Sequence, residues 1–138
     1  MSDPVRHGWR GYIASRPIQG SRVPQHIQNL VIRDHAQRNG LAFKLSATEY
    51  AMPHCYMMLD QVLEELPELE GIILYSMFML PWDPERRRAV YRKVLAQGAA
   101  LHAAAEDFTL RAEADVARWE DIFLVQSVVH PTQHPNQG

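Results

Sequence analysis

Short apolar runs alternate with longer segments of helical periodicity along the chain. Four runs are too short for helices and apolar enough for interior strands of a parallel sheet. They cover residues 11–15, 41–45, 71–75 and 100–105. The run at 71–75 carries the clearest strand signal, whereas the run at 100–105 is rich in alanine, a poor strand former, and is supported by its place after a helix.

The segments between and after these runs predict four helices. Prolines, an N-cap aspartate and glycines mark most of their ends. The boundaries are Pro24 and Asn39, Pro53 and Pro67, Asp83 and Gly98, and residues 112 and 129. The predicted inner faces comprise Ile27, Leu30 and Val31; Cys55, Met58, Leu59, Val62, Leu63 and Leu66; Val90, Tyr91, Val94 and Leu95; and Val116, Trp119, Ile122, Phe123 and Val129. On the third helix, the residues expected to face water are Arg86, Arg87, Arg88, Arg92 and Lys93.

This alternation predicts an α/β fold with helices on both faces of a mainly parallel sheet, joined by right-handed crossovers. We expect a three-layer sandwich with a four-stranded sheet in the order 2-1-3-4, plus a C-terminal helix. A single α/β domain covers residues 10–129, residues 1–9 form a loose N-terminal segment and residues 130–138 form a disordered tail.

The composition is that of an ordinary globular protein, with 46% hydrophobic residues and a formal net charge of -2. This balance argues against bulk attraction to nucleic acid or membranes. No signal peptide is indicated, and the most apolar run, residues 71–82, is shorter than the roughly 20 residues of a membrane helix. The single cysteine, Cys55, leaves a reducing cytoplasm as the expected compartment. The seven histidines lack metal-ligand spacing, and no metal or cofactor is expected.

Polar side chains follow every predicted strand. Ligands of such sheets bind at the carboxyl ends of the strands, near the switch in strand order, which here lies between the first and third strands. Ser15 and Arg16 follow the first strand, and Tyr75 and Ser76 end the third. Residues from the second and fourth strand ends complete the rim: Ser46, Thr48, Glu49, Glu106 and Asp107. We expect the substrate contacts to come from Ser46, Thr48, Tyr50, Tyr75 and Ser76.

The loop after the first strand has the residue types of a phosphate site. Arg16 and Arg22 offer bidentate contacts, Ser21 adds a hydroxyl, and Gln25 lies where the helix opened by Pro24 presents free N–H groups. A solvated polar loop is the alternative interpretation. The agreement between loop position and strand-end geometry favours the phosphate site.

Glu49, Ser15 and Glu106 are the candidate catalytic residues. Glu49 suits a general base, or equally an acidic cap for the helix near Pro53. Glu106 is the second acid–base candidate, and Ser15 is a candidate nucleophile without an adjacent histidine. Cys55 shares the face of the second helix with apolar residues, which favours a core cysteine over an activated thiolate and leaves its accessibility open.

Three stretches resemble the bacterial proteins called sporadic carbohydrate cluster proteins. They are GYIASRPIQGSRVPQHIQNLVIRDH, LSATEYAMPHCYMMLDQVLEELPELEGIILYSMFMLP and LAQGAALHAAAEDFTLR, within residues 11–111. The resemblance implies a role in the biosynthesis of surface polysaccharide or another carbohydrate, without an established reaction.

More distantly, the order of elements is similar to the catalytic domain of serine recombinases, which implies a resolvase-like or flavodoxin-like fold. Tyr12, Ser15, Arg16, Gln25 and Gln28 match that family's tyrosine, serine nucleophile, arginine and glutamines. The recombinases follow the third strand with an Asp-Arg-Leu-x-Arg segment that engages the scissile phosphate, where this chain has Ser-Met-Phe-Met-Leu-Pro. The departure argues against DNA strand cleavage.

The leading hypothesis is a cytoplasmic carbohydrate-biosynthesis protein that binds a phosphorylated sugar or nucleotide-sugar, with catalysis left open. One alternative is a non-catalytic accessory subunit of a carbohydrate-modifying enzyme, whose last helix docks a partner enzyme or forms a homodimer through Trp119 and Phe123. A weaker alternative is a resolvase-like nucleic-acid-binding module without cleavage activity.

Overall fold

The computed structural model describes residues 6–129 and forms an α/β fold around a five-stranded sheet. The strand order is β2-β1-β3-β4-β5, and all neighbouring strands are parallel except β4 and β5. The strands are β1 (Trp9–Ala14), β2 (Phe43–Glu49), β3 (Gly71–Leu74), β4 (Ala100–Ala103) and β5 (Phe108–Leu110). The helices are α1 (Gln25–Arg38), α2 (Met57–Glu64), α3 (Pro84–Ala96) and α4 (Glu113–Val129), with short 3₁₀ helices η1 (Leu66–Glu68) and η2 (Met77–Met79).

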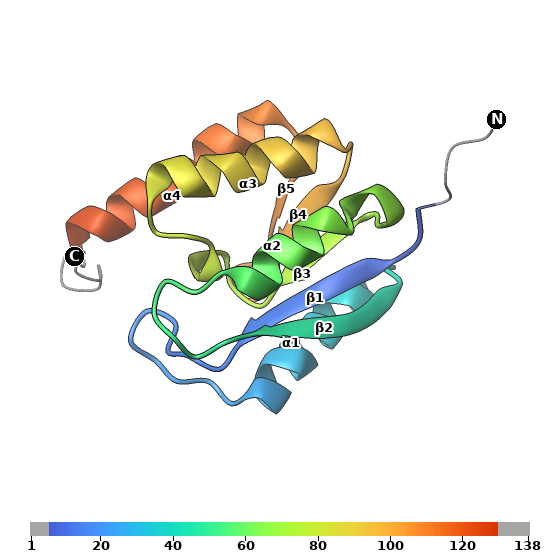
Figure 1. Ribbon diagram of the computed structural model, residues 1–138, viewed down its shortest axis with the longest axis horizontal. Coiled ribbons are helices and arrows are strands. Elements are labelled where there is room, and N and C mark those ends of the chain that lie inside the picture. Colours follow the sequence, from blue (N-terminus) through green and yellow to red (C-terminus); the bar gives the residue numbers. More distant parts are fainter. Residues whose placement is uncertain (1–5, 130–138) are drawn as a thin grey trace.

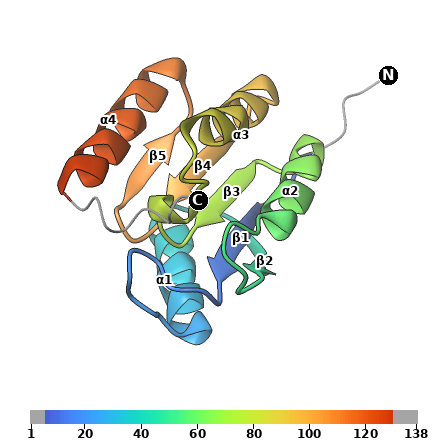
Figure 2. The same cartoon turned by 60° about the vertical axis from the view of Figure 1, so that its left-hand side comes forward.

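Alternation along the strands separates two cores, one on each face of the sheet. Tyr12, Ile72 and Leu74 face α2, α3 and α4, whereas Ile13 and Ile73 face α1. Figures 1 and 2 show the same division, with α1 alone on one side of the sheet. The predicted α/β class, the mainly parallel sheet, the order 2-1-3-4 and the C-terminal helix are therefore confirmed.

The prediction missed the fifth strand. Only three residues form β5, and the turn before it contains Asp107 at a φ of 61°, a conformation that aspartate adopts more readily than most residues. Nothing in so short a segment shows a strand period. Trp9, assigned to the loose N-terminal segment, begins β1; residues 1–5 and the predicted tail, 130–138, lie outside the described residues.

The second strand and the second helix both begin later than predicted. The strand runs from Phe43 to Glu49 instead of 41–45, and Leu45 is 75% exposed because β2 is an edge strand. The helix begins at Met57 rather than Pro53, because His54 has a φ of 60°, outside the range of a right-handed helix. The stretch between Glu49 and Met57 is therefore a loop.

The predicted inner face of α1 was wrong in part, since of Ile27, Leu30 and Val31 only Val31 packs against the core. Leu30 is 59% exposed, whereas Gln28, Ile32 and His35 are buried at helical spacing. A pattern of apolar letters cannot reveal this face, because two of its members are polar side chains with specific partners. The Gln28 amide bonds the backbone of Ala14, and His35 bonds a second buried histidine.

That second histidine is His102 on β4, whose Nδ1 lies 2.8 Å from His35 Nε2. Both rings are almost fully buried. Among the described residues, His102 Nε2 has no hydrogen-bond partner, and His35 Nδ1 has only the exposed Asp107 carboxylate nearby, at 3.5 Å. Burial, reinforced by the neighbouring His35, lowers the pKa of His102 to about 4, and burial also lowers the pKa of His35. Both side chains are therefore neutral near pH 7.

The buried histidine pair makes stability depend on pH. In the unfolded chain a histidine takes up a proton near pH 6.5, whereas folded His102 resists protonation down to about pH 4, so stability is full above pH 6.5 and falls as the pH decreases. We expect a loss on the order of 3 kcal/mol by pH 4 from His102, measured as the free energy of urea unfolding.

The control is His102→Gln, which removes the titrating group. Its unfolding free energy should change less than that of the wild type between pH 6.5 and 5, above the range in which most carboxylates titrate. A wild-type free energy that stays constant over this interval would contradict the prediction.

Candidate functional site

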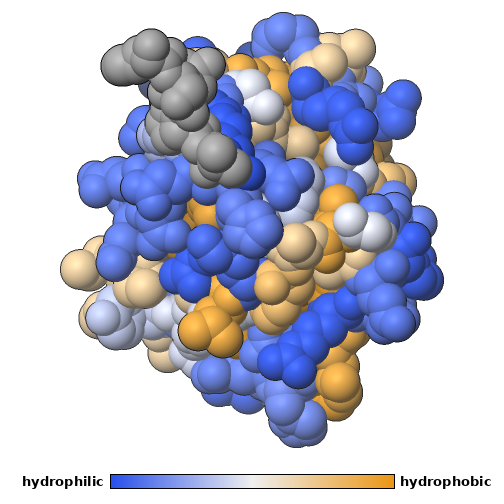
Figure 3. Space-filling model, turned by 90° about the vertical axis from the view of Figure 1, so that its right-hand side faces the viewer, coloured by the Kyte–Doolittle hydropathy of each residue, from blue (hydrophilic) through white to orange (hydrophobic). Residues whose placement is uncertain are grey.

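The loops that follow β1, β2 and β3 meet at the carboxyl ends of the parallel strands, at the left in Figure 1. Because β1 has β2 on one side and β3 on the other, the switch in strand order lies between β1 and β3 as predicted. Figure 3 shows the opposite end of the molecule, which is mainly hydrophilic, with hydrophobic residues in small separate areas.

The loop between β1 and α1 is held in one shape by local bonds. The buried Gln28 side chain accepts from Ala14 N–H at 3.0 Å and donates to the carbonyls of Ala14 and Val23. Ile18 and Ser21 pair in both directions around Gln19 and Gly20, which have φ values of 52° and 79°. A two-residue turn with both φ values positive is typical of tight hairpins. The loop therefore projects as a rigid hairpin.

This hairpin separates two pockets, and Gln19 lines both. One, of about 250 Å³, is called here the Arg16 pocket and is lined by Arg16, Pro17, Gln19, Ala51, Pro53, His54, Tyr56, Phe78, Leu80 and Trp82. The other, of about 280 Å³, is called the Glu106 pocket and is lined by Ile18, Gln19, Ser21, Val23, Tyr75, Ser76, Ala105, Glu106 and Gln126. The predicted site residues are thus divided between two neighbouring pockets.

Arg16 is oriented by the loop that follows β2. Its Nη1 donates to the Cys55 carbonyl at 2.7 Å, and its guanidinium lies 4.8 Å from the centre of the Tyr56 ring. Among the described residues, Arg16 makes no salt bridge, and the Arg16 pocket has no acidic side chain in its lining. A held guanidinium without a carboxylate partner can bind an anionic ligand.

Two residues of the Arg16 pocket have unusual backbone conformations. Gln19 and His54 are two of the three residues other than glycine with positive φ in the described part of the chain. Such conformations cost free energy and concentrate at functional sites. Their presence in the lining of one pocket supports a binding role for it.

The Glu106 pocket contains a bonded serine–carboxylate pair. Ser76 Oγ donates to Glu106 Oε2 at 2.7 Å and accepts from Phe78 N–H, while Met77 N–H donates to Glu106 Oε1 at 2.9 Å. The carboxylate is partly exposed and Ser76 is buried. Of the predicted catalytic residues, Glu106 is the one that lines a pocket.

The predicted phosphate cradle is not assembled around Arg16. Arg22 and Gln25 are exposed, and Arg22 reaches only the Ser15 carbonyl, at 3.5 Å. Ser21 lies in the Glu106 pocket, on the other side of the hairpin from Arg16. Ser15 Oγ donates to the Glu49 carbonyl. The reason is the hairpin, which turns the chain between Arg16 and the start of α1.

The residues predicted at the end of β2 are placed differently from one another. Ser46 and Thr48 lie within the strand, and Ser46 Oγ donates to Asn29 on α1 at 2.6 Å. Tyr50 is half exposed, and its carbonyl lies 3.4 Å from Arg16 Nη1. The three described pockets do not include these side chains in their lining. Ser46 and Thr48 therefore have a structural role in the strand, and Tyr50 has one in the loop that follows it.

Glu49 is completely buried and its carboxylate joins three elements. It accepts from the Tyr12 hydroxyl at 2.6 Å and from the N–H groups of Met58 and Leu59 at 3.1 and 3.0 Å, at the start of α2. Burial alone would raise the pKa of Glu49, but the hydrogen bonds from Tyr12 and the helix outweigh it and hold the pKa below its usual value. Of the two interpretations of Glu49, the geometry therefore agrees with the helix cap. The same carboxylate also accepts a hydrogen bond from Tyr12.

Cys55 is not on the apolar face of a helix, as the sequence suggested. It lies half-buried in the loop before α2, with Sγ 3.7 Å from Glu49 Oε2. Its carbonyl is the group that holds Arg16. The residue therefore has a structural role through its backbone.

The aromatic walls of the Arg16 pocket were missed at the sequence level. Tyr56 had been placed inside a helix, and Phe78 within the apolar run after β3. Trp82 carried a usable signal, because a tryptophan enclosed between Pro81 and Pro84 beside a strand end is held in a rigid turn.

Residues 6–129 contain no cluster of three or more His, Cys, Asp or Glu side chains that could hold a metal ion. In the same part of the chain, no helix has the length and apolar character needed to cross a membrane. No protein-family model matches the chain, and no match was found among the curated proteins or the solved structures compared with it.

The buried position of Glu49 yields a stability test. Glu49→Ala should destabilise the fold by about 3 kcal/mol or more, because it leaves the Tyr12 hydroxyl and two helix N–H groups without an acceptor. Glu49→Gln retains an acceptor and should lose about 1–2 kcal/mol. Urea unfolding measures both changes. An unfolding free energy of Glu49→Ala close to that of the wild type would contradict the cap.

Proposed function

We propose that the chain binds a phosphorylated sugar or nucleotide-sugar through the Arg16 pocket, as part of carbohydrate biosynthesis in the cytoplasm. The observation that carries this proposal is the Arg16 guanidinium, which is held at the Cys55 carbonyl and over Tyr56 and faces a pocket without acidic residues. A planar guanidinium forms bidentate bonds with phosphate oxygens.

The aromatic lining supports a ring-bearing ligand. Tyr56, Phe78 and Trp82 give the Arg16 pocket flat apolar walls, and Gln19 and His54 add polar groups at its edge. Ligand pockets commonly combine an apolar lining with a few polar groups that fix orientation. A sugar ring or a nucleobase joined to a phosphate has the matching chemistry, since bases stack on aromatic side chains.

The resemblance to sporadic carbohydrate cluster proteins is the reason for choosing a carbohydrate as the carrier of the phosphate. The sheet order, with a switch point between β1 and β3, is that of flavodoxin-like sheets and supports a resolvase-like or flavodoxin-like relationship. The recombinases bind the scissile phosphate of DNA at the corresponding edge of the sheet, and we propose that this chain binds the phosphate of a small molecule there.

Glu106 is the acid–base candidate that we retain for a reaction at this site. Its carboxylate is partly exposed in the neighbouring pocket and bonds Ser76, whereas Glu49 has no exposed atoms and is saturated with donors. A ligand that extends past Gln19, which lines both pockets, enters the pocket of Glu106.

The two loop arginines provide a matched test. Arg16→Ala should weaken the binding of a hexose 1-phosphate or nucleotide-sugar by about 10- to 100-fold, the value of a charge-assisted hydrogen bond. Arg16→Lys should fall between the wild type and Arg16→Ala, because lysine keeps the charge without the fork. Isothermal titration calorimetry measures these affinities.

Arg22→Ala is the control, because Arg22 lies outside the Arg16 pocket and should bind the same ligands within about threefold of the wild type. Equal losses in Arg16→Ala and Arg22→Ala would indicate a diffuse electrostatic surface instead of a pocket. Unchanged affinity in Arg16→Ala would refute the proposed phosphate contact.

A second candidate role, docking to another copy of the chain, is favoured by α4. For Trp119 and Phe123 the sequence allowed either packing within the chain or a dimer seam, and both are buried within the chain. The C-terminal half of α4 instead exposes Leu124, Val125, Val128 and also Val129, which the sequence had placed on the inner face. These four residues, called here the apolar stripe, lie within two turns of one another and carry no charge. Two copies of the stripe can therefore pack on each other in a symmetric dimer.

The stripe predicts the mass of the protein in solution. Light scattering after size exclusion should give a dimer for the wild type and a monomer for Val128→Glu, because two carboxylates would face each other across the interface. Arg33→Glu, on the exposed side of α1, is the control and should remain dimeric. A wild-type monomer at every concentration would exclude this interface.

A further inference from the structure

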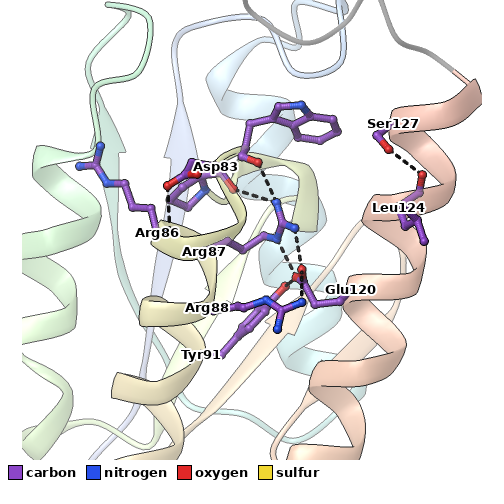
Figure 4. A network of polar contacts seen from close by, with 10 residues as sticks. Asp83, Arg86, Arg87, Arg88, Tyr91, Glu120, Leu124 and Ser127 are labelled. Carbon is purple, nitrogen blue, oxygen red and sulfur yellow. Dashed lines mark hydrogen bonds and ion pairs between the residues drawn. The ribbon is translucent and has the colours of Figure 1, made fainter. Parts of the chain in front are cut away.

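A groove of about 640 Å³ lies between α3 and α4, beside the Arg16 pocket. Glu120, Leu124 and Ser127 lie along the edge of α4 that faces α3, and Arg87 and Arg88 reach Glu120 from α3 (Figure 4). This volume is called here the α3–α4 groove. The sequence analysis did not predict a ligand site between these two helices.

The floor of the groove is rigid. Arg87 donates through two nitrogens to the Glu120 carboxylate at 2.6 and 2.7 Å, and through Nη1 to the carbonyls of Pro81 and Trp82. Its guanidinium also lies 3.9 Å from the centre of the Phe123 ring. The sequence placed Arg87 in water, but it is 4% exposed. With its bonds to Glu120 satisfied, Arg87 fixes the backbone on both sides of Trp82 rather than binding a ligand.

The groove and the Arg16 pocket are neighbours that share part of their walls. His54 and Trp82 line both of them. Phe123, in the groove, contacts Trp82 and also Phe78, which lines the Arg16 pocket, at ring separations of 5.5 and 5.3 Å. The cluster of Phe78, Trp82 and Phe123 therefore contributes to the walls of both volumes. His54, the other residue shared by the two linings, comes from the loop after β2.

Size separates the candidate ligands. The Arg16 pocket, at about 250 Å³, is smaller than the roughly 300–1,000 Å³ typical of ligand pockets, and it suits one ring with a phosphate. The α3–α4 groove, at about 640 Å³, lies within that range. A nucleotide-sugar matches two neighbouring volumes of these sizes, because it joins a sugar ring and a nucleoside through a diphosphate.

The lining of the groove favours a nucleoside over a lipid chain. Trp82 and Phe123 contribute aromatic side chains to the lining, the residue type on which bases stack, and Asp121, Ser127 and Arg88 add polar groups suited to ribose hydroxyls and base edges. A hydrocarbon chain would lie against Arg87 and Glu120 and bring no hydrogen bonds to the polar rim.

We propose that the Arg16 pocket and the α3–α4 groove form one cleft for a nucleoside diphosphate sugar. The sugar occupies the Arg16 pocket, the diphosphate lies at Arg16 and His54, and the nucleoside lies in the groove against Trp82. This assignment rests on the proposed function and narrows its ligand from any phosphorylated sugar to a nucleotide-sugar.

The test compares whole and partial ligands by isothermal titration calorimetry. The probes are glucose 1-phosphate, galactose 1-phosphate and mannose 1-phosphate, together with UDP-glucose, UDP-galactose and GDP-mannose. At least one nucleotide-sugar should bind tenfold or more tightly than its matching sugar phosphate. Ser127→Trp, which fills the groove, should remove this advantage and leave the affinity for the sugar phosphate unchanged.

Leu124→Trp is a second groove-filling variant, at a side chain that is 63% exposed. Because Leu124 also belongs to the surface proposed for dimerisation, light scattering of this variant accompanies the titration, and the comparison is made at equal oligomeric state. Ala117→Trp is the matched control, because Ala117 is exposed on the same helix and does not line the groove. It should bind every probe as the wild type does, and thermal unfolding of each variant shows that it is folded.

The outcomes separate this inference from the proposed function. If sugar phosphates bind with Arg16-dependent affinity and the nucleotide-sugars bind no more tightly, the proposed function stands and the extended cleft is overturned. If the nucleotide-sugar advantage survives both groove-filling variants, the nucleoside lies elsewhere and the inference is again overturned. If no probe binds the wild type, both the proposed function and the extended cleft fail.

Discussion

The carboxylate of Glu49 is the interaction on which the arrangement of this protein depends. A buried charge is costly unless it is fully hydrogen-bonded, and Glu49 satisfies this condition with the Tyr12 hydroxyl of β1 and the first N–H groups of α2. Because α2 has no side-chain cap of its own, Glu49 determines where the helix begins. One side chain thereby joins β1, β2 and α2.

The position of the helix start in turn determines the shape of the loop before it. That loop passes through His54 at positive φ and presents the Cys55 carbonyl to Arg16, which also stacks on Tyr56. The guanidinium is therefore oriented by a backbone group, and its charge stays available to a ligand. The shape of the candidate site therefore follows from the hydrogen bonds that the fold provides to the buried Glu49 carboxylate.

The same principle recurs at Gln28, His35 and Arg87. Each is a polar side chain on the buried face of a helix, and each is held by specific partners: the Ala14 backbone, His102 and Glu120. A prediction from the spacing of apolar residues fails for such faces, because it places every polar side chain on the solvent-exposed side of the helix. This is why the inner face of α1 was mispredicted and why the floor of the α3–α4 groove was not anticipated.

Sequence alone determined the alternation of strands and helices, the mainly parallel sheet with its order 2-1-3-4, and the edge of that sheet at which polar loops gather. These features follow from local periodicity and from the handedness of crossovers. Only the tertiary structure decided that the β1–α1 hairpin separates Arg16 from Ser21 and Glu106, that Glu49 is a buried cap, and that aromatic residues from the β2–α2 and β3–α3 connections line one pocket. The physical reason is that these outcomes depend on hydrogen bonds and packing between residues far apart in the chain, which no local pattern encodes.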